Sequence, residues 1–408
     1  MAMLDRPVDP ARAEALDAAD PLRGFRARFA IRDPDLVYLD GNSLGRLPLA
    51  TAERLRTVVD EEWGGDLIRA WDSWLDLPVR VGTRLASAVL GARPGEVIVS
   101  DSTTVNFYKL ALAALEARPG RRSVVTDRAN FPTDRYVLEG LARSRGLKVR
   151  WIESDPVDGP TTADVEAALD DDVAVVTLSL VNYRSAAIAD MPAISSLARA
   201  AGAFSLWDLS HAAGALEIGL QESGADLAVG CTYKYLNGGP GSPAFLYVRT
   251  VLQAELRNPI QGWFGQRDQF AMGPAYDRAS GIRSWLTGTP TIPAIVAVDE
   301  GARLVEEAGI ANVRAKAAAL SAYAVELHDN WLARLGFSLG SPRNPTRRGA
   351  HVAVRHPEAR RLTEAMIRHG VVTDFREPDS IRLGLSPLTT SFRDVWTGLA
   401  LLRDLGGG

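Results

Sequence analysis

The stretch that decides the fold is FSLWDLSHAAGALEIGLQESGADLAVGCTYKYLNGGPG, residues 204–241. It holds two short apolar runs, at residues 204–207 and 227–230, and polar residues follow each of them. Short runs that are apolar on both faces are typical of buried parallel strands, and ligands collect at the carboxyl ends of such strands. Asp208 and Lys234, 26 residues apart, follow the two runs and are therefore predicted to face one cavity.

The same pattern continues along the chain on both sides of this stretch. Five more short apolar runs alternate with amphipathic stretches, at residues 96–99, 123–126, 149–152, 173–180 and 244–248. Strands that alternate with helices are typical of an α/β fold. We therefore expect a mostly parallel seven-stranded sheet with helices covering both of its faces.

The N-terminal segment predicts helices on either side of a short strand. Residues 10–30 and 50–90 have the apolar spacing of amphipathic helices. Between them, a short extended run at 37–40 leads into the turn-rich loop GNSLG at 41–45.

The C-terminal part predicts a small α+β domain. A long helical stretch begins near Pro293, runs past Asn330 and leads away from the sheet. Two strand candidates follow, at 349–354 and 380–384, with helices between and after them. The predicted division is a large domain at 45–295 and a small domain formed by 1–44 and 296–408.

Composition and charge favour a small-molecule substrate. The 408 residues carry a net charge of −4 with acids and bases interspersed, so no basic stripe predicts a nucleic acid or membrane partner. The N-terminus is polar, and no stretch reaches the ~18 apolar residues of a spanning helix, which predicts a cytoplasmic protein. The single cysteine, Cys231, excludes an intramolecular disulfide, and the five histidines show no metal-ligand spacing.

An aspartate and a lysine at neighbouring strand ends match what pyridoxal 5′-phosphate (PLP) requires of a protein. The acid can pair with a protonated pyridine nitrogen, and the lysine can form an imine. Beside Lys234, the glycine-rich run at 238–241 lets the backbone approach a ligand closely. Neither this run nor the loop at 41–45 has the spacing of a nucleotide-binding loop. From spacing alone, a surface lysine and an ordinary strand-end aspartate remain alternatives.

Eight strings along the chain resemble those of kynureninases, in the order that this family has them. They are YLDGNSLGRLP, WGGDLIRAW, DSTTVN, NFPTDRY, WDLSHAAGA, TYKYLNGGPG, GWFGQ and GTPTIPA. Kynureninases are fold-type I PLP enzymes related to class V aminotransferases. The resemblance covers nearly the whole chain and implies PLP-dependent hydrolysis of L-kynurenine to anthranilate and L-alanine.

The resemblance assigns the catalytic groups. Lys234 is implied to be the lysine that forms the imine with PLP and then moves protons. Asp208 is implied to keep the pyridine nitrogen protonated. Tyr233 matches a phosphate-contacting tyrosine and could relay protons at the γ-carbonyl. His211, expected one helical turn after Asp208, is a cofactor contact by this reading, with capping or packing as the alternative.

Further residues are implied to hold the cofactor. Thr103 and Thr104 precede a predicted helix and match phosphate-binding positions. Trp263 and Thr289 match residues that reach the phosphate from the second subunit, so the resemblance implies a homodimer. Three other implied contacts are Phe131, which stacks on the ring, Asp134 in the polar shell, and Ser179 at the end of its strand. For Phe131 and Asp134, ordinary turn formation by the Pro-Thr-Asp sequence is the alternative.

The implied substrate contacts lie near the two ends of the chain. Arg382 matches the family's carboxylate-binding arginine, and an arginine fork suits an amino-acid carboxylate. Asn42 and Ser43 are expected to line the entrance, although a tight-turn role would explain them equally well. Kynureninases that prefer 3-hydroxykynurenine have asparagine at the position of Thr289 and a histidine in the segment matching residues 63–74. This chain has neither, which favours plain kynurenine.

Three other readings compete with this one. A related class V lyase could act on a ring-modified kynurenine or on another amino acid. A cysteine desulfurase would need a nucleophilic cysteine on a mobile loop, whereas Cys231 lies three residues before Lys234 at a predicted strand end. A catalytically silent protein would be expected to lack the lysine, the aspartate or the arginine, and all three are present.

Overall fold

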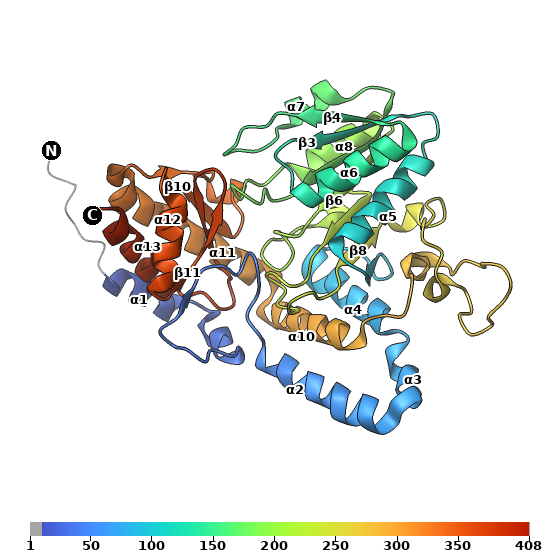
Figure 1. Cartoon of the computed structure of the whole chain (residues 1–408), viewed down its shortest axis with the longest axis horizontal. Coiled ribbons are helices and arrows are strands. Elements are labelled where there is room, and N and C mark those ends of the chain that lie inside the picture. Colours follow the sequence, from blue (N-terminus) through green and yellow to red (C-terminus); the bar gives the residue numbers. More distant parts are fainter. Residues whose placement is uncertain (1–9, 408) are drawn as a thin grey trace.

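The computed structural model describes residues 10–407, so residues 1–9 and 408 of the predicted small domain lie outside the described residues. Two lobes lie side by side (Figure 1), and the first segment of the chain lies against the last in the smaller lobe. The domain boundaries at 45 and 295 stay a prediction.

The larger lobe is built on the expected sheet. Within the described residues its seven strands lie in the order β2-β8-β7-β6-β5-β3-β4, and β8 alone pairs antiparallel with its neighbours. Each of the seven apolar runs supplies one strand. The strands are β2 (Val97–Val99), β3 (Ser123–Asp127), β4 (Lys148–Ile152), β5 (Val173–Ser179), β6 (Phe204–Asp208), β7 (Leu227–Gly230) and β8 (Phe245–Val248).

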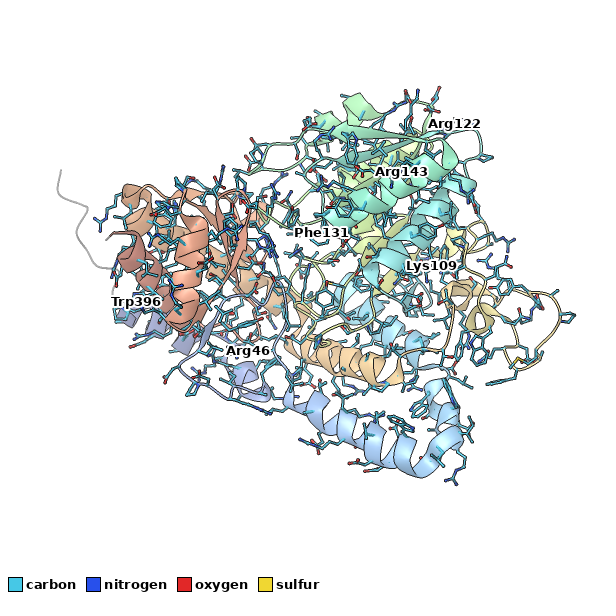
Figure 2. The ribbon with its side chains drawn as sticks, viewed as in Figure 1. Arg46, Lys109, Arg122, Phe131, Arg143 and Trp396 are labelled. Carbon is cyan, nitrogen blue, oxygen red and sulfur yellow. The ribbon has the colours of Figure 1, made fainter. Side chains whose placement is uncertain are left out.

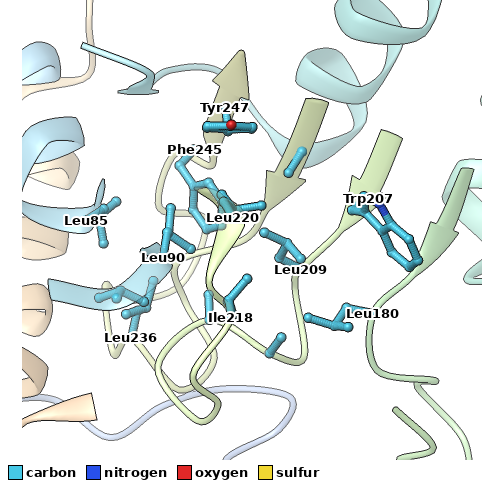
Figure 3. Packing of buried hydrophobic residues seen from close by; sticks show 14 of the residues in the cluster. Leu85, Leu90, Leu180, Trp207, Leu209, Ile218, Leu220, Leu236, Phe245 and Tyr247 are labelled. Atoms are coloured by element: carbon cyan, nitrogen blue, oxygen red, sulfur yellow. The ribbon is translucent and has the colours of Figure 1, made fainter. Parts of the chain in front are cut away.

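Helices cover both faces of this sheet, because successive strand residues point to opposite sides. Val124 packs with one hydrophobic cluster and Val125 with the other. The first cluster holds α5 (Thr103–Glu116) and α6 (Pro132–Arg145), and the second holds α4 (Leu77–Leu85), α8 (Met191–Ala200) and α10 (Ile292–Ala308). Figure 3 shows Trp207, Phe245 and Tyr247 from the strands among leucines of the second cluster. Two shorter helices of this lobe are α7 (Thr162–Ala168) and α9 (Leu220–Ser223).

The smaller lobe has its own sheets and core. Four antiparallel strands lie in the order β12-β13-β10-β9, and β1 pairs parallel with β11. The strands are β1 (Val37–Tyr38), β9 (Ser338–Leu339), β10 (His351–Arg355), β11 (Val371–Val372), β12 (Asp374–Arg376) and β13 (Ser380–Gly384). The helices are α1 (Pro10–Ala19), α11 (Ile310–Leu327), α12 (Ala359–Arg368) and α13 (Phe392–Gly406). The predicted strands at 349–354 and 380–384 correspond to β10 and β13.

Two predicted helices are shorter than expected. The helix predicted at 10–30 ends at Ala19, because Pro21 disfavours a helical conformation at the residue before it. One stretch of 3-10 helix, η1 (Arg23–Arg28), follows. The helix predicted from Pro293 past Asn330 is broken at Gly309, whose φ of +75° lies outside the right-handed helical region.

Two segments project from the larger lobe (Figure 1) and expose apolar side chains. The first comprises α2 (Leu49–Thr57), the π-helix η2 (Val58–Asp66), the 3-10 helix η3 (Leu67–Ala70) and α3 (Trp71–Trp74), so the helix predicted at 50–90 is interrupted. The second spans residues 250–285. The remaining short helices are η4 (Ala86–Leu90), η5 (Thr250–Leu252), η6 (Trp263–Gly265), η7 (Gly281–Trp285), η8 (His328–Leu332), η9 (Ala333–Leu335) and η10 (Pro345–Arg347). Between residues 10 and 407, no helix is both long and apolar enough to span a membrane.

Candidate active site

Neighbouring strand ends bring the predicted residues to one edge of the large sheet. Ser179 at the end of β5 is the Cα partner of Asp208 at the end of β6. The loop after β7 turns back at Lys234, whose carbonyl accepts from the Asn237 N–H at 3.0 Å. The GNSLG loop packs under this turn, where the Gly45 N–H donates to the Tyr233 carbonyl at 2.7 Å.

Lys234 is a buried amine that faces His211 and an aromatic ring. Its Nζ lies 2.9 Å from His211 Nε2 and 5.7 Å from the centroid of the Phe131 ring. Burial, and then the charge of Lys234, lowers the pKa of His211 well below its ordinary value. Because an ammonium group only donates, the neutral imidazole accepts at Nε2. His211 lies in a turn after β6, not in a helix as expected, since the Ala212 N–H donates to the Leu209 carbonyl at 2.9 Å.

A second carboxyl group lies beside Asp208. Asp134, in the first turn of α6, is 1% exposed, and its Oδ2 accepts from Asn130 Nδ2 at 3.3 Å. Burial, and then repulsion from Asp208, raises the pKa of Asp134 well above its ordinary value. Asn130 Oδ1 in turn accepts from Ser179 Oγ at 2.5 Å. Sequence reasoning missed Asn130 as a connecting group, although the string NFPTDRY begins with it.

These residues fit a PLP ring. Asp134 Oδ1 and His211 Nδ1 are buried and lack a hydrogen-bond partner, so both atoms remain available to bind a ligand. A pyridinium nitrogen would give the Asp134 and Asp208 carboxyl groups the positive charge that they lack. Phe131 offers an aromatic surface, its ring packing edge-on against Tyr183 with centroids 5.2 Å apart. Figure 2 shows Phe131 on the side of the larger lobe that faces the smaller one.

The start of α5 has the features of a phosphate site. Thr103 and Thr104 are its first two residues, and the Ser102 side chain caps it by accepting from the Val105 N–H at 3.3 Å. The free N–H groups of a helix start and adjacent hydroxyls suit an anion.

A buried ion pair, which the sequence did not reveal, lies beside the start of α5. Lys109 Nζ, fully buried, lies 2.7 Å from Asp101 Oδ2 and donates to the Trp285 carbonyl at 2.8 Å. Asp101 also accepts from Thr287 Oγ1 at 3.1 Å. The ion pair therefore joins the start of α5 to the segment that carries Thr289.

Trp263 and Thr289 are exposed within the single chain. The Trp263 ring is 40% exposed and packs against Phe264 and Phe270. Thr289 is exposed and lines a cavity of about 230 Å³ together with Ser102. Their contact with a second subunit's phosphate stays a prediction.

Arg382, on β13, uses four of its five N–H groups within the protein. It is 1% exposed, and its Nε donates to Asp374 Oδ1 at 2.8 Å while its Nη2 donates to Asp374 Oδ2. Nη2 also lies 3.3 Å from Ser43 Oγ, and Nη1 donates to the Tyr183 carbonyl. Ser43 Oγ itself donates to Asp374 Oδ2 at 3.0 Å. The sequence pointed to Arg382 and Ser43 but gave no signal for Asp374.

Asn42 lies deeper than expected. It is 0% exposed, so it does not line an entrance, and neither atom of its amide group has a partner. It fills the space beside Gly384, where a Cβ would lie 1.8 Å from Asn42 Oδ1. The neighbouring Asp40 is partly buried, and this burial, followed by repulsion from Asp374, raises the pKa of Asp40 to about 6. A substrate contact by Asn42 stays a prediction.

His351, on β10, is a buried polar residue that sequence reasoning missed. It is 0% exposed, and its ring centroid lies 5.4 Å from that of His211. Burial, and then the positive charge of Arg382, lowers the pKa of His351 to about 3, and Lys234 acts in the same direction. The available signal was a lone histidine within the apolar strand candidate at 349–354.

Tyr233 and Cys231 keep their protons. Burial, and then the neighbouring Cys231, raises the pKa of Tyr233, so its hydroxyl acts as a donor. Burial likewise raises the pKa of Cys231, which is 3% exposed in the loop that carries Lys234. A buried protonated thiol is a poor nucleophile.

Three comparisons with known proteins relate the chain to characterised families. Residues 313–402 match the family model described as kynureninase C-terminal domain. The chain is 42% identical over 399 residues to the kynureninase of Pseudomonas fluorescens, covering 96% of this chain and 94% of that protein. It is 43% identical over 401 residues to the kynureninase of Burkholderia pseudomallei, with the same coverage of both chains.

Solved structures share the fold. A cysteine desulfurase from Thermococcus onnurineus superposes with a TM-score of 0.80 at 18% identity, covering 100% of both chains. C-DES with glycine covalently linked to its PLP cofactor also gives a TM-score of 0.80, at 16% identity, covering 91% of this chain and 97% of that chain.

Proposed function

Because this chain belongs to the kynureninase family of PLP-dependent hydrolases, we propose that it hydrolyses L-kynurenine to anthranilate and L-alanine, in preference to 3-hydroxykynurenine. The observation that carries the proposal is the buried Lys234 amine beside His211, the Phe131 ring and the Asp134 and Asp208 carboxyl groups. An amine placed in this way can form an imine and then move protons.

PLP, when bound, supplies a protonated ring that accepts the electron pair released at the substrate's α-carbon. The residues around it keep that ring protonated and oriented. Asp208 would hold the proton on the pyridine nitrogen, Phe131 would pack against the ring, and the hydroxyls of Thr103 and Thr104 would bind the phosphate. Ser179 and Asn130 hold Asp134 in place through their hydrogen bonds.

Proton transfer falls to Lys234 and Tyr233. The Lys234 amine removes the proton from the substrate's α-carbon. His211 stays neutral and accepts a hydrogen bond from Lys234 when the amine carries the proton. Tyr233, which is protonated in the resting site, gives its proton to the γ-carbonyl oxygen as water adds there, and it takes a proton back from the hydrate as the Cβ–Cγ bond breaks.

The preference for plain kynurenine rests on two positions. Thr289 occupies the place of an asparagine, and residues 63–74 contain no histidine, so the features expected of a 3-hydroxykynurenine enzyme are missing. A related lyase that acts on a ring-modified kynurenine or another amino acid is the alternative. Sulfur chemistry is disfavoured because Cys231 is buried with a raised pKa.

We also propose that the enzyme is a homodimer with shared active sites. The two projecting segments expose large apolar side chains, a pattern that marks interaction surfaces. These side chains are Val59, Trp63, Leu67, Ile68, Trp263, Phe270 and Met272. A second copy that covers them would bring Trp263 and Thr289 of one subunit toward the phosphate of the other.

The test is turnover by the purified PLP-loaded protein. L-kynurenine should give anthranilate and alanine in equal amounts, and 3-hydroxykynurenine should be a poorer substrate by kcat/KM. Lys234→Ala should abolish turnover and the visible absorption band of lysine-bound PLP. The band without turnover of either compound would favour the alternative lyase, and a protein that binds no PLP would contradict the proposal.

A mixing experiment tests the dimer. Lys234→Ala and Thr289→Ala homodimers should each have low activity, whereas a heterodimer of the two has one site with both residues intact. Activity that rises on subunit exchange supports shared sites. A monomer by light scattering, or no gain on mixing, would contradict them.

A further inference from the structure

Neither ring nitrogen of His351 has a hydrogen-bond partner with good geometry. Both of its ring nitrogens are buried and unpartnered, although the Arg184 backbone is close enough to favour protonation weakly. Leaving a buried polar group without a hydrogen bond destabilises the folded protein. A histidine that served only to fill space in β10 would therefore be a poor choice beside Val352 and Val354 of the same strand.

Arg382 has few donors left for a ligand. A guanidinium has five N–H groups, and Asp374, Ser43 and the Tyr183 carbonyl take four of them. One N–H, on Nη1, remains. A carboxylate is held best by two parallel donors, so Arg382 in this arrangement offers only half of such a site.

His351 and Arg382 lie on the same face of the small sheet. In the antiparallel ladder, His351 is opposite Gly384, and Arg382 is opposite Ala353. Because residues two apart in a strand share a face, the imidazole and the guanidinium are diagonal neighbours. Gly384 itself carries no side chain, and the Asn42 amide occupies the space where its Cβ would lie. On its other side, the His351 ring meets His211, which contacts Lys234.

We propose that His351 supplies the second donor of the substrate's α-carboxylate site, beside the remaining Nη1 proton of Arg382. In this arrangement Asp374 is a positioning residue that fixes the direction of the guanidinium. The inference rests on the proposed function, because it takes an α-amino acid as the ligand. A neutral imidazole carries one N–H, which donates to the carboxylate, and one free nitrogen, which can accept from water or from the substrate.

The experiment compares ligands with and without the carboxylate in the PLP-loaded enzyme. For His351→Leu, we expect KM for L-kynurenine to rise about 10- to 100-fold, the range for a hydrogen bond to a charged group, with a much smaller change in kcat. The dissociation constant of L-alanine, measured by calorimetry, should rise by a similar factor. That of the decarboxylated amine of kynurenine should stay within about 3-fold of the wild-type value, because it lacks the charged acceptor.

Two variants serve as controls. His351→Gln keeps an N–H donor and should recover most of the affinity for L-alanine. His328→Leu makes the same substitution at another buried histidine of the small lobe, whose Nδ1 lies 3.0 Å from Asp329 Oδ1, and should leave all three ligands unaffected.

The outcomes separate this inference from the proposed function. An unchanged affinity for L-alanine in His351→Leu, or equal losses for the acid and the amine, would overturn the role of His351. A fall in kcat alone would overturn it too, because that places the ring at the γ-carbonyl. If the wild-type enzyme binds L-alanine but does not cleave kynurenine, the proposed function fails. The dissociation constants of L-alanine for the wild type and His351→Leu still test the role of His351 in that case.

Discussion

The two sides of the candidate active site satisfy their polar groups differently. On the large-sheet side, formed by Asp134, Asp208, His211 and Lys234, buried atoms such as Asp134 Oδ1 and His211 Nδ1 have no partner. On the small-sheet side, formed by His351, Asp374 and Arg382, the His351 ring nitrogens are unpartnered too, but the arginine is held at four of its five N–H groups. The first side is incomplete without a cofactor, whereas the second fixes its cation before any ligand arrives.

This difference predicts different consequences for substitution. Substituting a residue on the large-sheet side should lower catalytic activity more than the free energy of unfolding, because such a residue makes few contacts within the protein. Removing a partner of Arg382 should cost stability first, because an unpaired charge would remain buried.

The largest expected effect is on catalysis by the large-sheet side. Asp208→Asn removes the carboxylate that we propose holds the proton on the pyridine nitrogen. We expect kcat/KM to fall about 100- to 1,000-fold, the usual loss for one preorganised electrostatic group, with the free energy of unfolding of the apoenzyme nearly unchanged. Steady-state kinetics and denaturant unfolding measure the two. An Asp208→Asn enzyme with wild-type kcat/KM would contradict the catalytic role of the large-sheet side.

The next effect is on the stability of the small-sheet side. Asp374→Asn keeps the shape of the side chain but leaves Arg382 without its carboxylate, so the free energy of unfolding should fall by about 3–5 kcal/mol. The matched control is Glu377→Gln, which breaks an exposed ion pair with Arg360 and should cost less than ~1 kcal/mol. If urea unfolding gave the two variants equal losses of unfolding free energy, Arg382 would not be held as the structure indicates.

The smallest effect is a dependence of stability on pH. Burial and the charges of Arg382 and Lys234 lower the pKa of His351 to about 3, while Asp374 opposes them. Since the unfolded state then binds the proton more readily, this contribution is present at neutral pH and is lost as the pH falls below ~6.5.

Comparison with His351→Gln isolates that contribution. The wild-type free energy of unfolding, relative to the variant, should fall by about 1.4 kcal/mol for each pH unit below ~6. Unfolding curves between pH 7 and pH 5 provide the measurement. Parallel pH profiles for the two proteins would mean that the ring is protonated as easily in the folded state as in the unfolded one.

The sequence predicted the large-sheet side well because strand order determines it. Asp208, Lys234 and Ser179 each follow a recognisable apolar run, and parallel strands end at one edge. Phe131 and Asp134 could be predicted for the same reason, since both lie in the short segment that follows β3. The resemblance to kynureninases added their roles, which spacing alone left open.

The small-sheet side could not be derived in the same way. Its contacts join segments far apart in the chain, such as Ser43 with Asp374 and Arg382 with the Tyr183 carbonyl. They depend on an antiparallel register that periodicity does not specify. The break at Gly309 was missed for a related reason, because an isolated glycine in a helical pattern is often tolerated.

The loop at 41–45 has a consequence for protein engineering. It contributes Ser43 to the small-sheet side, where we propose that the substrate carboxylate binds, and this makes it an attractive target for libraries that seek new substrates. Gly45, however, lies under the lysine loop, where any Cβ would be 2.3 Å from the Lys234 carbonyl oxygen and 2.4 Å from Asn237 Oδ1. A library that randomises the whole loop would lose most of its members to a displaced lysine or to clashes at Gly41 and Asn42, whereas one that keeps these residues and Gly45 can vary Ser43 and Leu44.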